Sequence, residues 1–278
     1  EKMTDTRGAA VGENLLRASY VKEEADIEGG FAGVFGTIAE NYFQRHGDQS
    51  DALAKIAAKN HKNGVNNPLA QIQKDLGYDF CRNVSDKNPL VAGGPLKRTD
   101  CSLVSDGAAA VVLSDVDSAL AMEKAVIFRA AAHVNDFLPM NRRDILMFDG
   151  CEKAWGTALD SAGLTLDDLD FVETHDCFTV AELLEYEAMG LTPRGEGSRA
   201  IHEGWTEMGG KLPVNPSGGL KSKGHPIGAT GVSMHVLSAM QLTGTAGGIQ
   251  VKDAKMAGIF NMGGTAVANF CSILEPLR

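Results

Sequence analysis

The sequence predicts an α/β layered fold, because strand-like and helix-like runs alternate through its second half. Residues 169–174, LDFVET, form a short apolar run that predicts a strand, and residues 179–190, TVAELLEYEAMG, follow it with helical spacing. A further helix is expected over 231–244. Residues 255–275 then contain two strand-like runs joined by a pair of glycines, which is a hairpin signal.

Helix boundaries in this half carry their own signals. Over 145–162 the apolar residues fall at helical spacing, and Gly163 ends the run. In the next helix, Thr179 and Glu182 have the spacing of a capping box, and Gly190 is its stop signal. These signals predict where the helices of the layered domain begin and end.

The first half is expected to be mostly helical. Residues 12–75 look helical and polar, and the run 51–64 is rich in helix formers and ends at a glycine. Stretches rich in proline and glycine are expected to be extended or turning (66–71 and 88–100). Short apolar runs bounded by turn residues predict buried strands over 106–115 and 125–134.

Composition excludes several classes of function. The net charge of −10 over 278 residues argues against nucleic acid and anionic membranes as partners. The sequence contains no run of eighteen apolar residues and no signal peptide. An anionic ligand would need a local basic patch, for which Lys211, Lys221 and Lys223 are candidates, with solvated loop lysines as the alternative.

Cysteine usage favours a reducing, cytoplasmic compartment. Five cysteines stand at wide spacings without any C-x-x-C pair, which argues against a zinc site or a disulfide framework (Cys81, Cys101, Cys151, Cys177 and Cys271).

Three loops in the glycine-rich last third are candidate site elements. The first is His175-Asp176-Cys177-Phe178, at the carboxyl end of a predicted strand, where α/β proteins place their sites. A cysteine just before a helix start is favoured as a thiolate. The alternative is an inert core cysteine beside an ordinary polar histidine. A metal at His175 and Cys177 would need more ligands than the sequence offers nearby, so no metal is expected.

The second and third loops lie further along the chain. In Gly224–Gly231, His225 stands at a predicted helix amino terminus, where the dipole disfavours imidazolium and leaves a neutral base. A capping histidine is the alternative, and no phosphate-loop motif is complete. In the final hairpin, Asn261-Met262-Gly263-Gly264 is a turn whose Gly263 N–H could serve an oxyanion.

Taken in order, HDCF, NPSGGLKSKGHPIGATG and NMGG resemble the thiolase family. The resemblance is narrower to the sterol-carrier-protein-2 type and to bacterial acetyl-CoA acetyltransferases. Upstream, DCSLVSDGAAAVVLSD and NPLAQIQ are similar to the family as well, so the likeness covers essentially the whole chain. It implies a thiolase fold layered α-β-α-β-α. Residues 1–117 would be the remainder of a first half-domain with an inserted loop domain, and 118–278 the C-terminal half-domain.

The resemblance implies acyl transfer between coenzyme A thioesters, by thiolysis of 3-ketoacyl-CoA or Claisen condensation, with no permanently bound cofactor. His225 would activate a nucleophilic cysteine, while His175 and Gly263 would serve two oxyanion holes. Most thiolases have a cysteine where Asn261 stands, and Cys177 would take over its acid/base role. Substrate contacts are expected from four residues of the matching motifs (Ser217, Gly218, Phe178 and Met262).

One part of that machinery is missing from the sequence. No remaining cysteine fits the family's nucleophile, and Glu1-Lys2-Met3 is similar to the end of the segment that follows it. The chain is therefore expected to be an incomplete fragment, inactive alone, of a dimeric or tetrameric parent enzyme. The alternatives are a CoA-thioester-binding pseudoenzyme or one subunit of a split acyltransferase. Acyl chain length, reaction direction and any accessory protein are left open.

Overall fold

A four-stranded mixed sheet forms the centre of the computed structural model, which describes residues 1–277. Its strand order is β1-β4-β3-β2. Strand β1 (Val126–Asn135) pairs antiparallel with β4 (Ala268–Pro276), and β4 pairs antiparallel with β3 (Ala257–Gly263). Strand β2 (Phe171–Glu173) lies parallel to β3, so the carboxyl ends of these two strands meet at the same edge.

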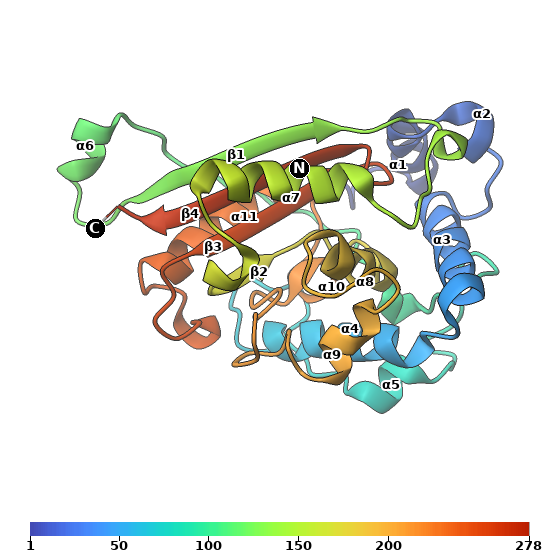
Figure 1. Cartoon of the computed structure of the whole chain (residues 1–278). Helices are drawn as coiled ribbons and strands as arrows, with labels where there is room; N and C mark the ends of the chain where they lie inside the picture. The colour runs from blue at the N-terminus through green and yellow to red at the C-terminus, as the bar shows by residue number, and fades with distance from the viewer. Residues whose placement is uncertain (278) are drawn as a thin grey trace.

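Helices cover the two faces of this sheet (Figure 1). Helix α7 (Asp149–Ala162) packs on β1 and β4, and helix α11 (Ile227–Leu242) packs on β3 and β4. The packing under α7 is close: a Cβ at Gly258 would lie 2.7 Å from the Trp155 ring. Only glycine therefore lets β3 approach the helix at this point.

Alternation along β3 sends its side chains to these two helices in turn. Phe260 and Met262 belong to the main core cluster with α7, whereas Ile259 belongs to a second cluster beside α11. Because strand side chains alternate between faces, Asn261 shares the α11 side with Ile259. Asn261 therefore lies on the face of the sheet that α11 covers.

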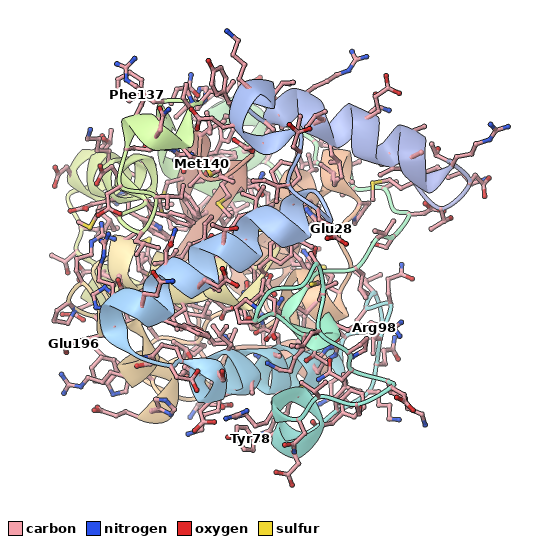
Figure 2. The ribbon with its side chains drawn as sticks, turned by 90° about the vertical axis from the view of Figure 1, so that its right-hand side faces the viewer. Glu28, Tyr78, Arg98, Phe137, Met140 and Glu196 are labelled. Carbon is pink, nitrogen blue, oxygen red and sulfur yellow. The ribbon has the colours of Figure 1, made fainter. Side chains whose placement is uncertain are left out.

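The remaining helices fill the regions around the sheet. They are α1 (Gly8–Leu15), α2 (Val21–Glu24), α3 (Phe31–His46), α4 (Ser50–Gly64), α5 (Tyr78–Arg82), α6 (Val116–Leu120), α8 (Thr179–Ala188), α9 (Gly197–His202), α10 (Gly219–Ser222) and five short 3₁₀ turns. Figure 2 shows α3 and α4 on one side of the molecule, with Glu28 before α3 and Tyr78 at the start of α5. Within residues 1–277 no helix is long and apolar enough to cross a membrane.

The main hydrophobic core contains residues from both the first and the second half of the sequence. It contains apolar residues of α3, α4, α7, α8 and the sheet in one cluster. All ten residues of α8 are buried, including three glutamates, and α4 buries much of its polar face as well. These two helices pack directly on each other. The polar helix expected in the first half is therefore an internal element of the fold.

Most of the expected elements are confirmed, with shifted ends. The run 51–64 forms α4, 179–190 contains α8, and 125–134 corresponds to β1. The final hairpin is present as β3 and β4. Helix α7 begins at Asp149, later than predicted, and ends at left-handed Gly163. Helix α11 starts at Ile227, directly after the N-cap Pro226, so the helix expected over 231–244 begins four residues earlier and its amino terminus lies beside His225, as expected.

Two local predictions are wrong. Residues 106–115 form no strand: the segment is extended, Val112 is 90% exposed, and no backbone hydrogen bond joins 108–114 to another strand within residues 1–277. An apolar run becomes a strand only where a neighbouring strand pairs with it. The capping box at the start of α8 is absent too, because Thr179 donates to Asp100 and Glu182 pairs with Lys59.

Candidate active site

His175 lies directly after β2, where the chain turns toward α8. The Asp176 backbone N–H donates to the Thr174 carbonyl oxygen at 3.1 Å, which makes a three-residue turn centred on His175. The turn directs the imidazole to the α11 side of the sheet, where His175 Nδ1 lies 2.6 Å from Asn261 Oδ1. An amide oxygen only accepts, so the ring proton sits on Nδ1 and Nε2 keeps its lone pair.

His225 is fixed at the start of α11 by two hydroxyl groups. Its backbone N–H donates to Ser105 Oγ at 2.7 Å, and its Nδ1 lies 2.7 Å from Thr230 Oγ1. The Thr230 hydroxyl donates its only proton to the Pro226 carbonyl oxygen at 3.0 Å. Its oxygen therefore accepts from the imidazole, so His225 also carries its proton on Nδ1 and leaves Nε2 bare.

The two imidazoles are in contact with each other. Their ring centroids are 5.0 Å apart and the planes meet at 84°, an edge-to-face arrangement. Burial lowers the pKa of His175 to about 4, and it lowers the pKa of His225 well below its usual value, with help from His175 and two lysines. Both rings are neutral near pH 7. In this tautomer, neither Nε2 can donate to an oxyanion until it has accepted a proton.

Cys177 is buried in the main core cluster beside the turn. Its carbonyl oxygen accepts from the Ser102 N–H at 2.8 Å, and the next residue, Phe178, stacks on Phe35 with centroids 4.5 Å apart. Burial, followed by the nearby Glu185, raises the pKa of the Cys177 thiol well above its usual value. The expected thiolate is therefore wrong: desolvation outweighs a helix-terminus effect of about 0.3–2 kcal/mol.

The other four cysteines are no better suited to be thiolates. Burial raises the pKa of Cys81 and Cys101 to about 11, and it raises that of Cys151 and Cys271 well above the usual range. All five cysteines are free thiols. Cys81, Cys151 and Cys271 are buried, and half-buried Cys101 keeps a raised pKa although Lys221 and Lys97 lie near it.

Asp176 anchors the turn after β2 to neighbouring elements of the fold. It is fully buried, and its carboxylate accepts from the Leu220 backbone N–H at 2.6 Å and from Asn60 Nδ2 at 2.8 Å. Burial and the neighbouring Glu182 raise its pKa to about 7. Gly219 has a φ of +60°, and a Cβ there would overlap the Asp176 carboxylate. Asp176 therefore holds the turn in place from the side of α4 and Leu220.

The predicted substrate contacts are less well placed. Met262 faces the main core, on the opposite side of the sheet from Asn261. Ser217 is fully buried, and its N–H, hydroxyl and carbonyl groups all have partners in Glu173 and Asn67. The Gly218 N–H donates to the Asn215 carbonyl oxygen. Gly263 is half-buried at the end of β3, next to the hairpin turn.

The lysines do not form the expected patch. Lys221 is buried and its Nζ donates to the Asp100 carbonyl oxygen at 2.6 Å. Lys223 is also buried, and its Nζ donates to Ser233 Oγ at 3.1 Å. Only Lys211 is exposed, beside Asp167 at 3.1 Å. The interpretation of Lys221 and Lys223 as solvated loop lysines is therefore wrong, because polar atoms of the fold replace their water.

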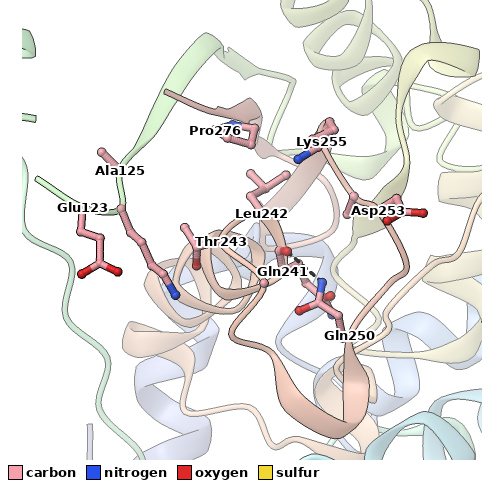
Figure 3. A pocket seen from close by; sticks show the side chains of 12 residues that line it. Glu123, Ala125, Gln241, Leu242, Thr243, Gln250, Asp253, Lys255 and Pro276 are labelled. Carbon is pink, nitrogen blue, oxygen red and sulfur yellow. Dashed lines mark hydrogen bonds between the residues drawn. The ribbon is translucent and has the colours of Figure 1, made fainter. Parts of the chain in front are cut away.

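A cavity of about 460 Å³ elsewhere in the molecule is not part of this site (Figure 3). It lies at the carboxyl end of α11 and is lined by Gln241, Thr243 and Lys255, among others. Helix α11 has 16 residues and is therefore about 24 Å long, so this cavity and His225 lie at opposite ends of it. Its lining includes neither histidine nor cysteine.

The structure thus brings together His175, His225 and Asn261 from three segments distant in sequence. Sequence patterns identified both histidines but not their fixing partners. Thr230 lies inside the motif that singled out His225, so its spacing was a usable signal. Ser105 carries no such signal, because its contact with His225 spans 120 residues.

Comparison with known proteins identifies the family of the chain. A family profile described as "Thiolase C-terminal domain-like" matches residues 131–276. An acetyl-CoA acetyltransferase of Methanothermobacter thermautotrophicus is 37% identical over 95% of this chain and 68% of its own length. Sterol carrier protein 2 of Oryctolagus cuniculus is 39% identical over 87% of this chain and 45% of its length. The benzoylsuccinyl-CoA thiolase subunit BbsB of Thauera aromatica is 34% identical over 79% and 56%, respectively.

Solved structures give the same fold. The Ltp2–ChsH2(DUF35) aldolase superposes with a TM-score of 0.74 at 22% identity, covering 89% of this chain and 64% of that one. A monomeric SCP2-thiolase-like protein of Mycobacterium smegmatis gives a TM-score of 0.63 at 18% identity, covering 90% and 53%. The α/β class and the thiolase fold are therefore confirmed. The chain spans between about half and two thirds of the relatives it matches.

Proposed function

Because the chain belongs to the thiolase family, we propose that its buried histidine pair acts on acyl thioesters of coenzyme A. The reaction would be thiolysis of a 3-ketoacyl-CoA or the reverse Claisen condensation. The observation that carries the proposal is the contact between two neutral imidazoles, His175 and His225. Neither Nε2 has a hydrogen-bond partner within residues 1–277, so both are available for proton transfer.

His225 is the better base for an attacking thiol. Its Nδ1–H is held by Thr230, so its Nε2 can take the thiol proton as sulfur bonds to the carbonyl carbon. The resulting imidazolium then carries an Nε2–H that can donate to the oxyanion. The Gly263 N–H is the second oxyanion contact in this proposal, and His175 contributes in the same way once protonated.

Cys177 is the proposed acid at the α-carbon. When the bond between the α-carbon and the keto carbon breaks, the electron pair stays on the departing acyl-CoA as an enolate. The Cys177 Sγ–H then gives that carbon its proton and becomes a thiolate. Burial keeps Cys177 in the thiol form at rest, which is the form that the cleavage direction needs. Condensation runs the same transfer backwards and needs the thiolate first.

Relatives support the substrate class. Their names include an acetyl-CoA acetyltransferase and a subunit of a CoA thiolase. The acyl-accepting nucleophile has no candidate among the five raised-pKa thiols, so a test should not depend on it. Exchange of α-protons meets that condition. The Cys177 thiol first passes its proton to a histidine Nε2, and the thiolate then takes the α-proton and leaves an enolate that is reprotonated.

The experiment incubates the chain with acetyl-CoA in D₂O and follows deuterium in the acetyl group by mass spectrometry, with calorimetry for binding. We expect binding, and exchange faster than in buffer alone. Cys177→Ala should abolish exchange, while Cys271→Ala, a buried thiol on β4, should not. Exchange that survives Cys177→Ala would contradict the acid/base role.

A second candidate function is binding of CoA thioesters without turnover, which the raised pKa of all five thiols favours. Binding without exchange would support this candidate and refute the catalytic one. If acetyl-CoA and coenzyme A do not bind at all, both candidates fail.

A further inference from the structure

A row of buried amides on α4 faces the loops that build the site. Asn60 and Asn63 stand three residues apart and so lie on one face of α4, and Asn67 follows three residues after the helix ends. Their Nδ2 groups donate to Asp176 and Glu182, to the Asn215 carbonyl oxygen, and to the Ser217 carbonyl oxygen, respectively. Helix α4 thus holds two loops that flank β2.

Asn60 makes a different contact from the other two. Its amide nitrogen lies 2.8 Å from Asp176 Oδ2 and 2.6 Å from Glu182 Oε2, so its two N–H bonds serve two carboxylates at once. Its Oδ1 is buried and has no partner within residues 1–277. A buried acceptor without a partner costs about 1–3 kcal/mol. Asn60 therefore uses both of its N–H donors and leaves its carbonyl oxygen without a partner.

Of the two carboxylates that Asn60 connects, that of Glu182 is the more firmly held. Glu182 accepts from Lys59 Nζ and from the Tyr186 hydroxyl, each at 2.5 Å, and from Asn215 Nδ2 at 3.1 Å. Lys59 and Glu182 side chains are both fully buried. Glu182 is thus held on all sides by donors from α4, α8 and the loop before α10.

The carboxylate of Asp176 has fewer hydrogen-bond donors than that of Glu182. Asp176 lies between His175 and Cys177 in the turn after β2, and apart from Asn60 its carboxylate is held by one backbone N–H, that of Leu220. Removing the Asn60 amide would leave two buried carboxyl groups facing each other with nothing between them. The turn would lose its link to α8, and wherever Asp176 is ionised its repulsion from Glu182, which three other donors hold, would push the turn away from that helix.

We propose that Asn60 is a positioning residue for the site. It bridges the Asp176 carboxylate to the Lys59–Glu182 ion pair, and so sets where His175 and Cys177 stand relative to the His225 ring. As a statement about catalysis this rests on the proposed function, whereas as a statement about the turn it stands on the contacts alone. Asn63 provides a matched comparison, because it is a buried amide on the same helix that donates to one backbone carbonyl at 3.0 Å.

The test compares Asn60→Ala, Asn60→Asp and Asn63→Ala in the full chain. Asn60→Asp keeps the size of the side chain and replaces the donors with a third carboxylate. For acetyl-CoA exchange, we expect both Asn60 variants to lower the limiting rate by about 10- to 100-fold, with KM within about threefold of wild type. Asn63→Ala should keep the limiting rate and KM within about twofold of wild type, although it should lose about as much stability as Asn60→Ala.

A second readout does not depend on the reaction. Histidine ring resonances, assigned with a His175→Gln reference, should shift for His175 in both Asn60 variants and stay unchanged in Asn63→Ala. Equal behaviour of Asn60→Ala and Asn63→Ala in this spectrum would overturn the proposal. Absence of exchange in the wild type, with the His175 shift present, would refute the proposed function and leave the positioning role supported.

Discussion

Replacement of His175 by glutamine should change how stability depends on pH. The His175 ring has an ordinary pKa of 6.5, which burial lowers to about 4 in the folded chain. Above pH 6.5 the ring is neutral in both states and contributes no pH dependence. Between about 6.5 and 4 the unfolded chain binds a proton that the folded chain refuses, so the free energy of unfolding falls as pH falls.

The magnitude follows from the gap between the two pKa values. A tenfold difference in proton affinity between the folded and unfolded chains is worth about 1.36 kcal/mol, so the gap from 6.5 to about 4 corresponds to roughly 3.4 kcal/mol when the loss is complete. At pH 5 about 2 kcal/mol of it has been lost. Absolute stability does not isolate this effect, because Asp176, whose pKa is raised to about 7, contributes with the opposite sign.

The informative quantity is therefore the difference between wild type and His175→Gln. Urea unfolding at pH 7 and at pH 5 should show the wild type losing about 2 kcal/mol relative to the variant. Asn63→Ala, which removes a buried amide and no titrating group, serves as the control and should show no such change. A difference that stays constant between the two pH values would refute the conclusion that His175 is a buried neutral imidazole.

Three further outcomes are expected. Lys59→Met should lower the free energy of unfolding by about 3–5 kcal/mol in urea, because it leaves a buried carboxylate without its cation. Gly219→Ala should lower the melting temperature, since φ is +60° and the new Cβ meets Asp176, while Gly156→Ala, with open space around it, should raise it slightly. Cys177 should react with a thiol reagent at pH 8 more than about tenfold slower in the folded than in the unfolded chain, as followed by mass spectrometry.

Local signals explain which elements could be predicted from the sequence. Helix α4 ends at Gly64 and helix α7 ends just before its C-cap Gly163, and such stop signals act within a few residues. The strand predicted over 106–115 is wrong because a strand depends on a partner that no local pattern describes. The Thr179–Glu182 spacing is misleading for a similar reason: the partner of Glu182 is 123 residues away in sequence.

In the candidate site, too, the features that depend on local sequence could be predicted, and those that depend on distant contacts could not. Its motifs predict His175 and His225, and the structure places their rings in contact. The helix-terminus position of His225 predicts a neutral ring there, but no motif predicts which nitrogen of either ring carries the proton, because that depends on Asn261 and Thr230. The thiolate expected at Cys177 is wrong because the helix dipole is visible in a sequence, whereas desolvation depends on the packed core.

Burial of so many charges beneath the site needs a reason other than stability. Ion pairs such as Lys59–Glu182 gain little net free energy, since desolvation offsets most of their attraction. They do have well-defined geometry, because a buried charge tolerates few alternative positions for its partners. A site made of neutral, desolvated imidazoles and a thiol has no charge of its own to hold its parts in place. We infer that the buried charged groups of α4 and α8 supply that order through Asn60 and Asp176, while the two imidazoles and the thiol are uncharged at rest.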